Sequence, residues 1–249
     1  MKGIVLAAGY ATRLYPLTKD RPKPLLRVGE KTILDYLLEG LKSLSELDVL
    51  FVVTNEKFNA IFREWAKIVN ASGRYPGFQI EIVNDGTTSN ETRLGAIADI
   101  QYVIDQEQID DDLLVAAGDN IFQFDFKELE RFYRTKNSDV IVAQELNDAE
   151  RLKQRGVVLF DENNKVISFE EKPAAPNSNF VCPALYIHKK ETVHMYKKYV
   201  DAGNNPDAPG HFIKWLYPKI SMYAFVMDKP AIDIGTKQVY EQVSLEFKK

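Results

Sequence analysis

The chain has 249 residues, of which 45% are hydrophobic and 27% charged, and a formal net charge of −4. This length and composition suffice for a buried core in one large or two closely joined lobes. The acidic balance argues against nonspecific binding to nucleic acids or anionic membranes, so any phosphate site must be local. The single cysteine, Cys182, excludes an intrachain disulfide, and no apolar run approaches the ~20 residues of a membrane span. These features predict a cytoplasmic protein.

The first part of the chain alternates between strand-like and helix-like apolar patterns. A β-branched run at residues 3–6 predicts a short buried strand. The spacing of apolar residues then predicts a helix at 33–41, a strand at 48–54, a helix at 58–69, a strand at 78–83, a helix at 94–104 and a strand at 113–117. This alternation predicts an α/β fold with a mainly parallel sheet flanked by helices, whose ligands bind beyond the carboxyl ends of the strands.

The second part of the chain combines a hairpin signal with helical signals. We expect a helix at 125–136 and a strand at 139–143, then a hairpin formed by residues 156–161 and 166–173 around the polar turn 162–165. Further on we expect a strand at 179–187, helices at 189–199 and 211–216, a strand at 222–227 and a final helix at 237–247. The loop at 204–210 is too short for a domain linker, so we expect a single domain over residues 1–249.

The stretch after the first strand combines small residues with two cations. Small residues let main-chain N–H groups approach a ligand closely, and here they are Ala7, Ala8, Gly9 and Ala11. The Arg13 guanidinium suits two phosphate oxygens at once, and Lys23 adds a point charge on a long stem. The stretch therefore predicts a phosphate-binding loop, although it is neither a Walker loop nor the Gly-x-Gly-x-x-Gly of a dinucleotide-binding fold.

Asp119 is a candidate metal ligand because of its place in the pattern. It lies beside Gly118 at the end of the strand at 113–117, so its carboxylate would face the same crevice as the phosphate loop and could hold Mg²⁺. In the alternative interpretation, Asp119 only begins a turn. Asp233 likewise has a local interpretation, in which it approaches the final helix and Thr236 caps that helix.

Three other polar positions have local interpretations as well. Residues 84–93 fit an exposed loop whose Ser89 or Asn90 caps the following helix. Glu171 and Lys172, at the end of the expected hairpin, fit a solvated ion-paired surface when they are taken alone. Tyr186 fits a core position as well as one that faces a substrate. Residue spacing leaves these alternatives open.

Taken together, the motifs resemble the sugar-1-phosphate nucleotidyltransferases. Residues 6–18, followed by Pro22-Lys23-Pro24, are similar to that family's phosphate-binding signature, from which Ala11 departs where the family has its second glycine. Further matches, in the family's order, are Gly118-Asp119-Asn120, Gly156-Val157-Val158 with Glu170-Glu171-Lys172-Pro173, and Asp233-Ile234-Gly235-Thr236. The resemblance implies a Rossmann-like α/β sheet with a small β-hairpin on the sugar-binding side. Residues 1–145 would mainly bind the nucleotide and residues 146–249 mainly the sugar phosphate.

The resemblance also implies roles for individual residues. It makes Arg13, Lys23 and Asp119 catalytic, and it makes Asp119 and Asp233 the ligands of Mg²⁺. The implied nucleotide-binding residues are Leu6, Ala8, Gly9, Tyr10, Ala11, Thr12, Arg13, Lys23, Asn84 and Gly95. The implied sugar-phosphate-binding residues are Gly156, Glu171, Lys172 and Tyr186. In this scheme Glu171 accepts hydrogen bonds from sugar hydroxyls and Lys172 meets the sugar phosphate.

The activity implied by the resemblance joins a nucleoside triphosphate and a sugar 1-phosphate to give a nucleoside-diphosphate sugar and pyrophosphate. These two substrates would be the partners, with no nucleic acid and no membrane. One alternative is a cytidylyltransferase for phosphocholine or another alcohol phosphate, because residues 84–93 match no familiar base-binding pattern. Another is a non-catalytic nucleotide-binding regulatory homologue, for which the Cβ of Ala11 is an argument. The base, the sugar and the oligomeric state stay open, with a homo-oligomer among the outcomes.

Overall fold

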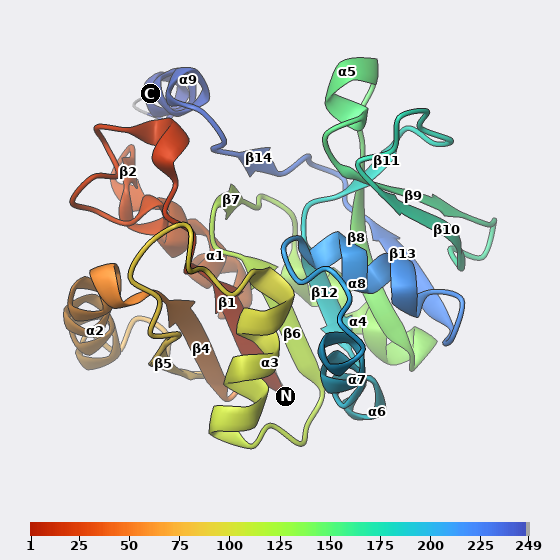
Figure 1. Ribbon diagram of the computed structural model, residues 1–249, viewed down its shortest axis with the longest axis horizontal. Coiled ribbons are helices and arrows are strands. Elements are labelled where there is room, and N and C mark those ends of the chain that lie inside the picture. Colours follow the sequence, from red (N-terminus) through yellow and green to blue (C-terminus); the bar gives the residue numbers. More distant parts are fainter. Residues whose placement is uncertain (248–249) are drawn as a thin grey trace.

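Four neighbouring strands of the central sheet run parallel in the computed structural model, which describes residues 1–247. They are β5 (Gln79–Asn84), β4 (Val49–Thr54), β1 (Lys2–Leu6) and β6 (Leu113–Ala117), side by side in that order (Figure 1). β1 pairs in parallel with both β4 and β6, and β4 pairs in parallel with β5. Their carboxyl ends therefore meet at one edge of the sheet, where the ligands of open α/β sheets bind.

The later strands extend the sheet in the antiparallel sense. They follow β6 in the order β12 (Leu185–His188), β8 (Asp139–Glu145), β11 (Phe180–Cys182), β9 (Gly156–Phe160) and β10 (Val166–Glu171). β9 and β10 form the expected hairpin, in which Gly156 lies opposite Glu171. A further strand, β13 (Met222–Val226), pairs in parallel with β8. The expected fold class is confirmed, and the ten-stranded sheet is mixed because the second half of the chain adds antiparallel strands.

Two expected elements of the second half are divided in the structure. The strand expected at 179–187 consists of β11 and β12, because Pro183 lacks an N–H group and Ala184 has a left-handed φ of 53°. β11 stays with the hairpin, whereas β12 crosses to β6. The helix expected at 189–199 consists of α6 (Lys190–Val193) and α7 (Met195–Asp201). The chain thus passes at Pro183 from the hairpin side of the sheet to the strand next to β6.

Alternate residues of the strands face two separate hydrophobic cores. On β1, Val5 belongs to one core and Ile4 to the other, as the two-residue period of a strand requires. The core around Val5 is covered by α1 (Ile33–Leu41), α2 (Glu56–Ala71) and α4 (Phe126–Lys136), and the core around Ile4 by α3 (Ala96–Glu107), α7 and α8 (Pro209–Leu216). Figure 1 shows this layered arrangement of helices, sheet and helices. None of the helices within residues 1–247 combines the length and the apolar character needed to cross a lipid bilayer.

A short ladder brings the C-terminal part of the chain to the carboxyl edge of the sheet. β14 (Ile232–Asp233) pairs antiparallel with β7 (Asn120–Ile121), and Asp233 lies opposite Asn120. The last helix, α9 (Lys237–Glu246), follows and packs beside the small sheet of β2 (Arg27–Val28) and β3 (Lys31–Thr32). Asp233 therefore reaches Asp119, although the two aspartates lie in distant parts of the sequence.

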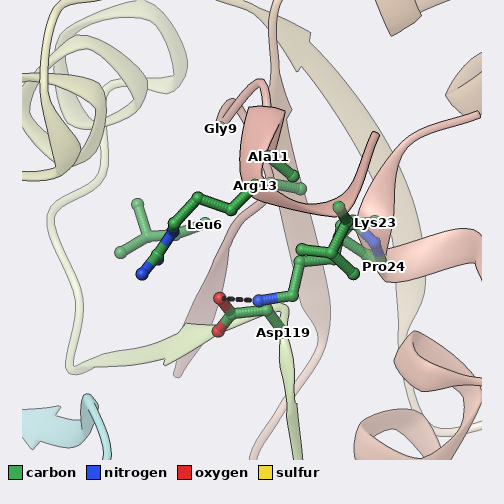
Figure 2. Close-up of a pocket in the computed structure, with 9 residues that line it drawn as sticks. Leu6, Gly9, Ala11, Arg13, Lys23, Pro24 and Asp119 are labelled. Atoms are coloured by element: carbon green, nitrogen blue, oxygen red, sulfur yellow. Dashed lines mark hydrogen bonds and ion pairs between the residues drawn. The ribbon is translucent and has the colours of Figure 1, made fainter. Parts of the chain in front are cut away.

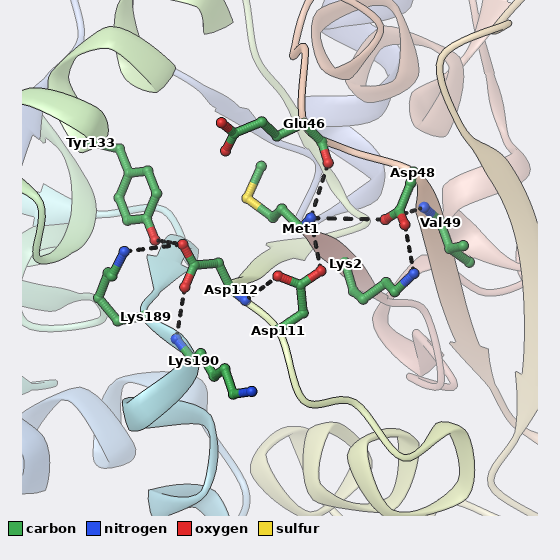
Figure 3. Close-up of polar contacts among 10 residues, drawn as sticks. All are labelled: Met1, Lys2, Glu46, Asp48, Val49, Asp111, Asp112, Tyr133, Lys189 and Lys190. Carbon is green, nitrogen blue, oxygen red and sulfur yellow. Dashed lines mark hydrogen bonds and ion pairs between the residues drawn. The ribbon is translucent and has the colours of Figure 1, made fainter.

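The opposite edge of the sheet is held by a network of charges (Figure 3). Lys2 pairs with Asp48 at 2.7 Å, which ties the beginnings of β1 and β4 together. Asp112, just before β6, accepts hydrogen bonds from the Tyr133 hydroxyl of α4, from Lys189 Nζ at 3.2 Å and from the Lys190 main-chain N–H at 2.8 Å. These contacts join both halves of the chain at the edge away from β7 and β14.

Candidate active site

The loop between β1 and the first 3₁₀ turn (Thr12–Leu14) leaves its backbone open to a ligand. Nothing lies within 4 Å of the place where a Cβ would stand on Gly9. Ala11 has a left-handed conformation with φ 47° and ψ 42°. Its carbonyl accepts hydrogen bonds from the Leu14 N–H at 3.0 Å and the Thr18 hydroxyl at 2.8 Å, and these bonds hold that conformation. The position therefore has the backbone of a glycine, as the family pattern has there, although an alanine occupies it.

This loop forms one wall of a cavity of about 210 Å³ (Figure 2). Its lining includes Leu6, Gly9, Ala11, Arg13, Lys23 and Asp119. Figure 2 shows the Arg13 side chain extending into the cavity and Lys23 directed at Asp119. Lys23 is 9% exposed, and its Nζ lies 2.7 Å from Asp119 Oδ2. The cavity thus combines open backbone with two cations, which is the chemistry of a polyphosphate site.

A second cavity, of about 630 Å³, lies on the side of the β9–β10 hairpin. The predicted residues that line it are Arg13, Asp119, Gly156, Glu171, Lys172, Tyr186 and Asp233. Arg13 and Asp119 also line the first cavity, so the two cavities meet at these side chains. The residues that line only one of the cavities divide as the resemblance divides their roles. Those expected to bind the nucleotide line only the first cavity: Leu6, Gly9, Ala11 and Lys23. Those expected to bind the sugar phosphate line only the second: Gly156, Glu171, Lys172 and Tyr186.

Charges of opposite sign alternate where the cavities meet. Lys23 Nζ lies 3.6 Å from Asp233 Oδ1 as well as 2.7 Å from Asp119, so it bridges both carboxylates. Arg155 pairs with the other oxygen of Asp233 at 2.6 Å. Burial opposes the ionisation of Asp119, but Lys23 and, more weakly, Arg155 outweigh it and hold the pKa of Asp119 below its ordinary value. Asp119 is therefore a carboxylate at neutral pH.

The same pair of aspartates fits a magnesium ion. Their oxygens lie close enough together to share the Lys23 ammonium, so a cation between them would meet both. Within residues 1–247, no third acidic, histidine or cysteine side chain joins them. Few protein ligands and an open side suit Mg²⁺, which keeps waters and takes phosphate oxygens as further ligands.

Glu171 is a buried carboxylate that faces the second cavity. Its side chain is 9% exposed, and Lys172 Nζ lies 3.9 Å from its Oε1. Burial raises the pKa of Glu171, while Lys172 and Arg155 oppose the shift. Glycines make room for the carboxylate, because a Cβ would lie 3.0 Å from Oε2 on Gly156 and 1.9 Å from it on Gly210. A carboxylate held this way can accept hydrogen bonds from hydroxyl groups in the cavity.

Several predicted nucleotide-binding residues do not line either cavity: Ala8, Tyr10, Thr12, Asn84 and Gly95. Tyr10 is buried, and its hydroxyl donates to the Thr87 carbonyl at 2.9 Å, which ties the phosphate loop to the loop after β5. The Ala8 carbonyl accepts a hydrogen bond from Asn55 at 2.8 Å. These hydrogen bonds stabilise the conformation of the phosphate loop from the side away from the cavities.

The remaining predicted positions have mixed surroundings. The Asn84 amide donates to Glu56 of α2. Gly95 has φ 96°, and a Cβ there would lie 2.7 Å from the Pro206 carbonyl oxygen, so packing alone requires a glycine. Tyr186 is 2% exposed, and it both belongs to the core and lines the second cavity. Sequence spacing left these two positions for Tyr186 open, and the structure combines them.

Sequence reasoning missed Arg155 entirely. The residue lies directly before Gly156 and pairs with Asp233 from the other end of the site. A cation next to the glycine of the hairpin was the one local signal. The pairing of Arg155 with Asp233 could not be predicted from the sequence. The β7–β14 ladder that places Asp233 has only two residues in each strand, too few for a recognisable pattern.

Comparison with known proteins shows the family of the chain. Residues 2–249 match the family model described as "Nucleotidyl transferase". The glucose-1-phosphate thymidylyltransferase of Neisseria meningitidis is 31% identical over 80% of this chain and 65% of its own length. The UTP–glucose-1-phosphate uridylyltransferase of Synechocystis sp. is 27% identical over 97% of this chain and 62% of its own length. The chain therefore spans less than two thirds of each of these relatives.

A solved structure supports the fold. The crystal structure of UDP-glucose pyrophosphorylase complexed with UDP-glucose superposes with a TM-score of 0.80, covering 99% of this chain and 97% of that one. At 17% sequence identity this likeness concerns the fold alone. Because the family model matches residues 2–249 and the motifs resemble the same group, the chain belongs to the nucleotidyl transferase family.

Proposed function

We propose that the protein transfers a nucleotidyl group from a nucleoside triphosphate to the phosphate of a sugar 1-phosphate. The observation that carries this proposal is that the two cavities meet at Arg13 and Asp119. A triphosphate in the smaller cavity and a sugar phosphate in the larger one would bring the α-phosphorus and the attacking oxygen together there. Positioning of this kind replaces an encounter between two free anions in solution.

The reaction needs no general base. A phosphate oxygen of the acceptor attacks the α-phosphorus, the bond from that phosphorus to the bridging oxygen breaks, and pyrophosphate leaves with the electron pair. The dianionic acceptor phosphate is already nucleophilic at neutral pH. The protein therefore has to hold anions together and to neutralise the charge that develops during transfer.

The cations of the site divide this work. Arg13 would hold the pyrophosphate oxygens, Lys23 the α-phosphate, and Lys172 the attacking phosphate. Asp119 and Asp233 would hold Mg²⁺, which supplies further neutralisation of phosphate charge when it is bound. Lys23 is poised for its role because it is almost buried and reaches both carboxylates.

The larger cavity supports a sugar as the acceptor. Glu171 offers a buried carboxylate for hydroxyl groups, and Gly156 and Gly210 leave the space beside it free of side chains. The backbone of residues 6–12 would bind the nucleoside phosphates, and Asn84 and Gly95 lie in the segment that we assign to the base. Tyr186 adds an aromatic surface to the sugar side.

The direct test measures pyrophosphate release from dTTP, UTP, CTP, GTP and ATP with Mg²⁺, each against a panel of sugar 1-phosphates and phosphocholine. We expect release that requires one triphosphate and one sugar 1-phosphate. Release only with CTP and an alcohol phosphate would instead identify a cytidylyltransferase of that kind. Nucleotide binding without any release would identify a regulatory homologue.

Lys23→Ala should lower kcat by about 10²–10³-fold, since it removes a charge aimed at the transferring phosphate. The control is Lys19→Ala, an exposed lysine of the same loop that lines neither cavity, and its kcat should equal that of the wild type. An unchanged kcat with a raised KM for Lys23→Ala would limit Lys23 to ground-state binding.

A further inference from the structure

Arg155 connects the two cavities through its main chain and its side chain. Its carbonyl oxygen accepts a hydrogen bond from the Lys172 N–H at 2.9 Å, on the acceptor side of the site. Its guanidinium reaches across to Asp233 Oδ2 at 2.6 Å, on the side of the candidate metal ligands. The side chain lines the larger cavity, in which the acceptor phosphate would lie. Arg155 is therefore fixed at one half of the site and paired at the other.

The charges around Asp233 balance only without a metal ion. Lys23 and Arg155 together neutralise Asp119 and Asp233. A divalent cation bound by the two carboxylates would leave two surplus positive charges on these side chains. Repulsion would then favour the departure of one of the two side chains from the carboxylates.

Arg155 is the side chain that is free to leave. Lys23 is 9% exposed and lies in a short 3₁₀ turn between prolines, whereas the Arg155 side chain is 35% exposed and borders a cavity of about 630 Å³. Its long, partly exposed stem borders that cavity. A phosphate dianion there would offer Arg155 two oxygens in place of the one carboxylate oxygen, Asp233 Oδ2, with which it pairs.

We propose that Arg155 is a switching residue that binds Asp233 in the free protein and the acceptor phosphate once Asp233 holds a divalent cation. This inference rests on the proposed function, since it assumes that the larger cavity takes a phosphorylated acceptor. Arg155 thereby competes with the metal ion when the acceptor is absent, and metal binding releases it for the acceptor. The result is a coupling between the two half-sites that favours an ordered, complete complex.

The test measures binding without turnover. For Arg155→Gln, the affinity for Mn²⁺ alone, followed by the electron paramagnetic resonance of the free ion, should rise about 3- to 10-fold, because a competing cation is gone. The affinity of the Mn²⁺-loaded protein for the sugar 1-phosphate found by the substrate panel, measured by calorimetry, should fall at least about tenfold. A fixed structural ion pair predicts the opposite for the metal, because loss of Arg155 would leave Asp233 poorly positioned.

Arg151→Gln is the matched control, because Arg151 is exposed, lines the same small cavity as Arg155 and Asp233, and makes no ion pair with Asp233. Both affinities should match the wild type. If Arg155→Gln does not fold, Arg155→Lys keeps the charge, loses the guanidinium fork, and should show both changes with smaller size. Mn²⁺ binding that is not tightened, or acceptor binding that is not weakened, would overturn the proposal.

The test remains decisive if the substrate panel shows no pyrophosphate release. Inorganic phosphate then replaces the sugar 1-phosphate as the probe, and the same two changes are expected. Opposite changes in metal and phosphate binding would support the switch although the proposed reaction had failed. Unchanged phosphate binding by Arg155→Gln would overturn the switch, whatever the wild-type protein catalyses.

Discussion

The left-handed backbone of Ala11 strains the phosphate loop in the folded protein. Non-glycine residues in this region are strained by about 1–2 kcal/mol, and Ala11 is held there by hydrogen bonds to its carbonyl from Leu14 and Thr18. A glycine would remove this strain but would also make the unfolded chain more flexible. At its single departure from the family signature, the loop therefore keeps the left-handed backbone that suits a glycine, although the residue is an alanine.

Ala11→Gly should stabilise the protein by about 0.5–1 kcal/mol, since the relieved strain exceeds the entropy of the added glycine. Urea denaturation followed by circular dichroism measures the change. Ala8→Gly is the control in the same loop, because Ala8 has no positive φ, and it should be destabilised by about 0.5–1 kcal/mol. Equal destabilisation of both variants would contradict the strain.

At the level of single residues, sequence reasoning named residues that lie together where a motif carries its own chemistry, and their roles stay predictions. Lys23 and Asp119, named from separate motifs, lie 2.7 Å apart. It failed where a role depends on a partner far along the chain. Arg155 is part of the site because it pairs with Asp233. The Tyr10 side chain supports the loop through its hydrogen bond to Thr87 and does not line the cavity. Neither of these two contacts could be predicted from the spacing of nearby residues.

Two buried carboxyl groups lie in the loop after β5 and in helix α3, on Asp85 and Asp99. Asp85 Oδ1 accepts hydrogen bonds from the N–H of Thr87 at 2.7 Å and from its hydroxyl at 2.8 Å. Asp85 Oδ2 and Asp99 Oδ1 are buried, and no donor reaches either oxygen within the described residues. Burial and, after it, the charge of Asp85 raise the pKa of Asp99 to about 8. One proton shared between these carboxyl groups accounts for both observations.

Asp99→Asn should change how stability depends on pH. Asp99 binds its proton more tightly in the folded protein, so its contribution to stability is complete below pH 4 and is lost as the pH rises toward 8. The asparagine keeps a donor at every pH. The melting temperature of Asp99→Asn relative to the wild type should therefore rise from pH 5 to about pH 8 and level off above that pH.

The control for this experiment is Asp105→Asn on the exposed face of α3, which leaves the buried pair intact. Its melting curve should follow that of the wild type at every pH. Parallel curves for Asp99→Asn and the wild type would mean that no proton is shared between Asp85 and Asp99.

Among the elements, those with a strong period were predictable and those set by a partner were not. The helix expected at 33–41 matches α1 in both bounds, because its apolar face and the capping box of Thr32 and Asp35 are local features. The strand expected at 179–187 is wrong in its middle, because the apolar pattern hid the effect of Pro183. The two-residue strands β7 and β14 are too short for any period and are formed by their pairing.

In the whole molecule, the candidate site and the stabilising charge network lie at opposite edges of the sheet. The cavities, the phosphate loop and the paired aspartates lie at the carboxyl edge, whereas the network around Lys2 and Asp112 lies at the amino edge (Figure 3). Burial opposes the ionisation of Asp112, but hydrogen bonds from Tyr133, Lys190 and Lys189 prevail and lower its pKa. The stability that Asp112 provides is present at neutral pH and is lost in acid.

Asp112→Ala should cost about 1–3 kcal/mol of stability and leave kcat unchanged, because it removes the acceptor for partners from α4 and from the start of α6 but lies at the edge away from the cavities. Urea denaturation and the pyrophosphate assay measure the two effects. Asp110→Ala, an exposed neighbour paired with Lys190, should have a smaller effect on stability. A large fall in kcat for folded Asp112→Ala would contradict this separation.

The shared wall of the two cavities has a consequence for inhibitor design. Because Arg13 and Asp119 border both cavities, the proposed sites for the nucleotide and the sugar phosphate adjoin at these two side chains. One molecule that carries both groups on a short linker can occupy both cavities, and its second group then binds at an effective concentration in the millimolar range or above. Such a molecule can bind about 10²–10⁴-fold more tightly than either fragment alone. Linking fragments across Arg13 and Asp119 is thus a more direct route to a tight inhibitor than enlarging either fragment within its own cavity.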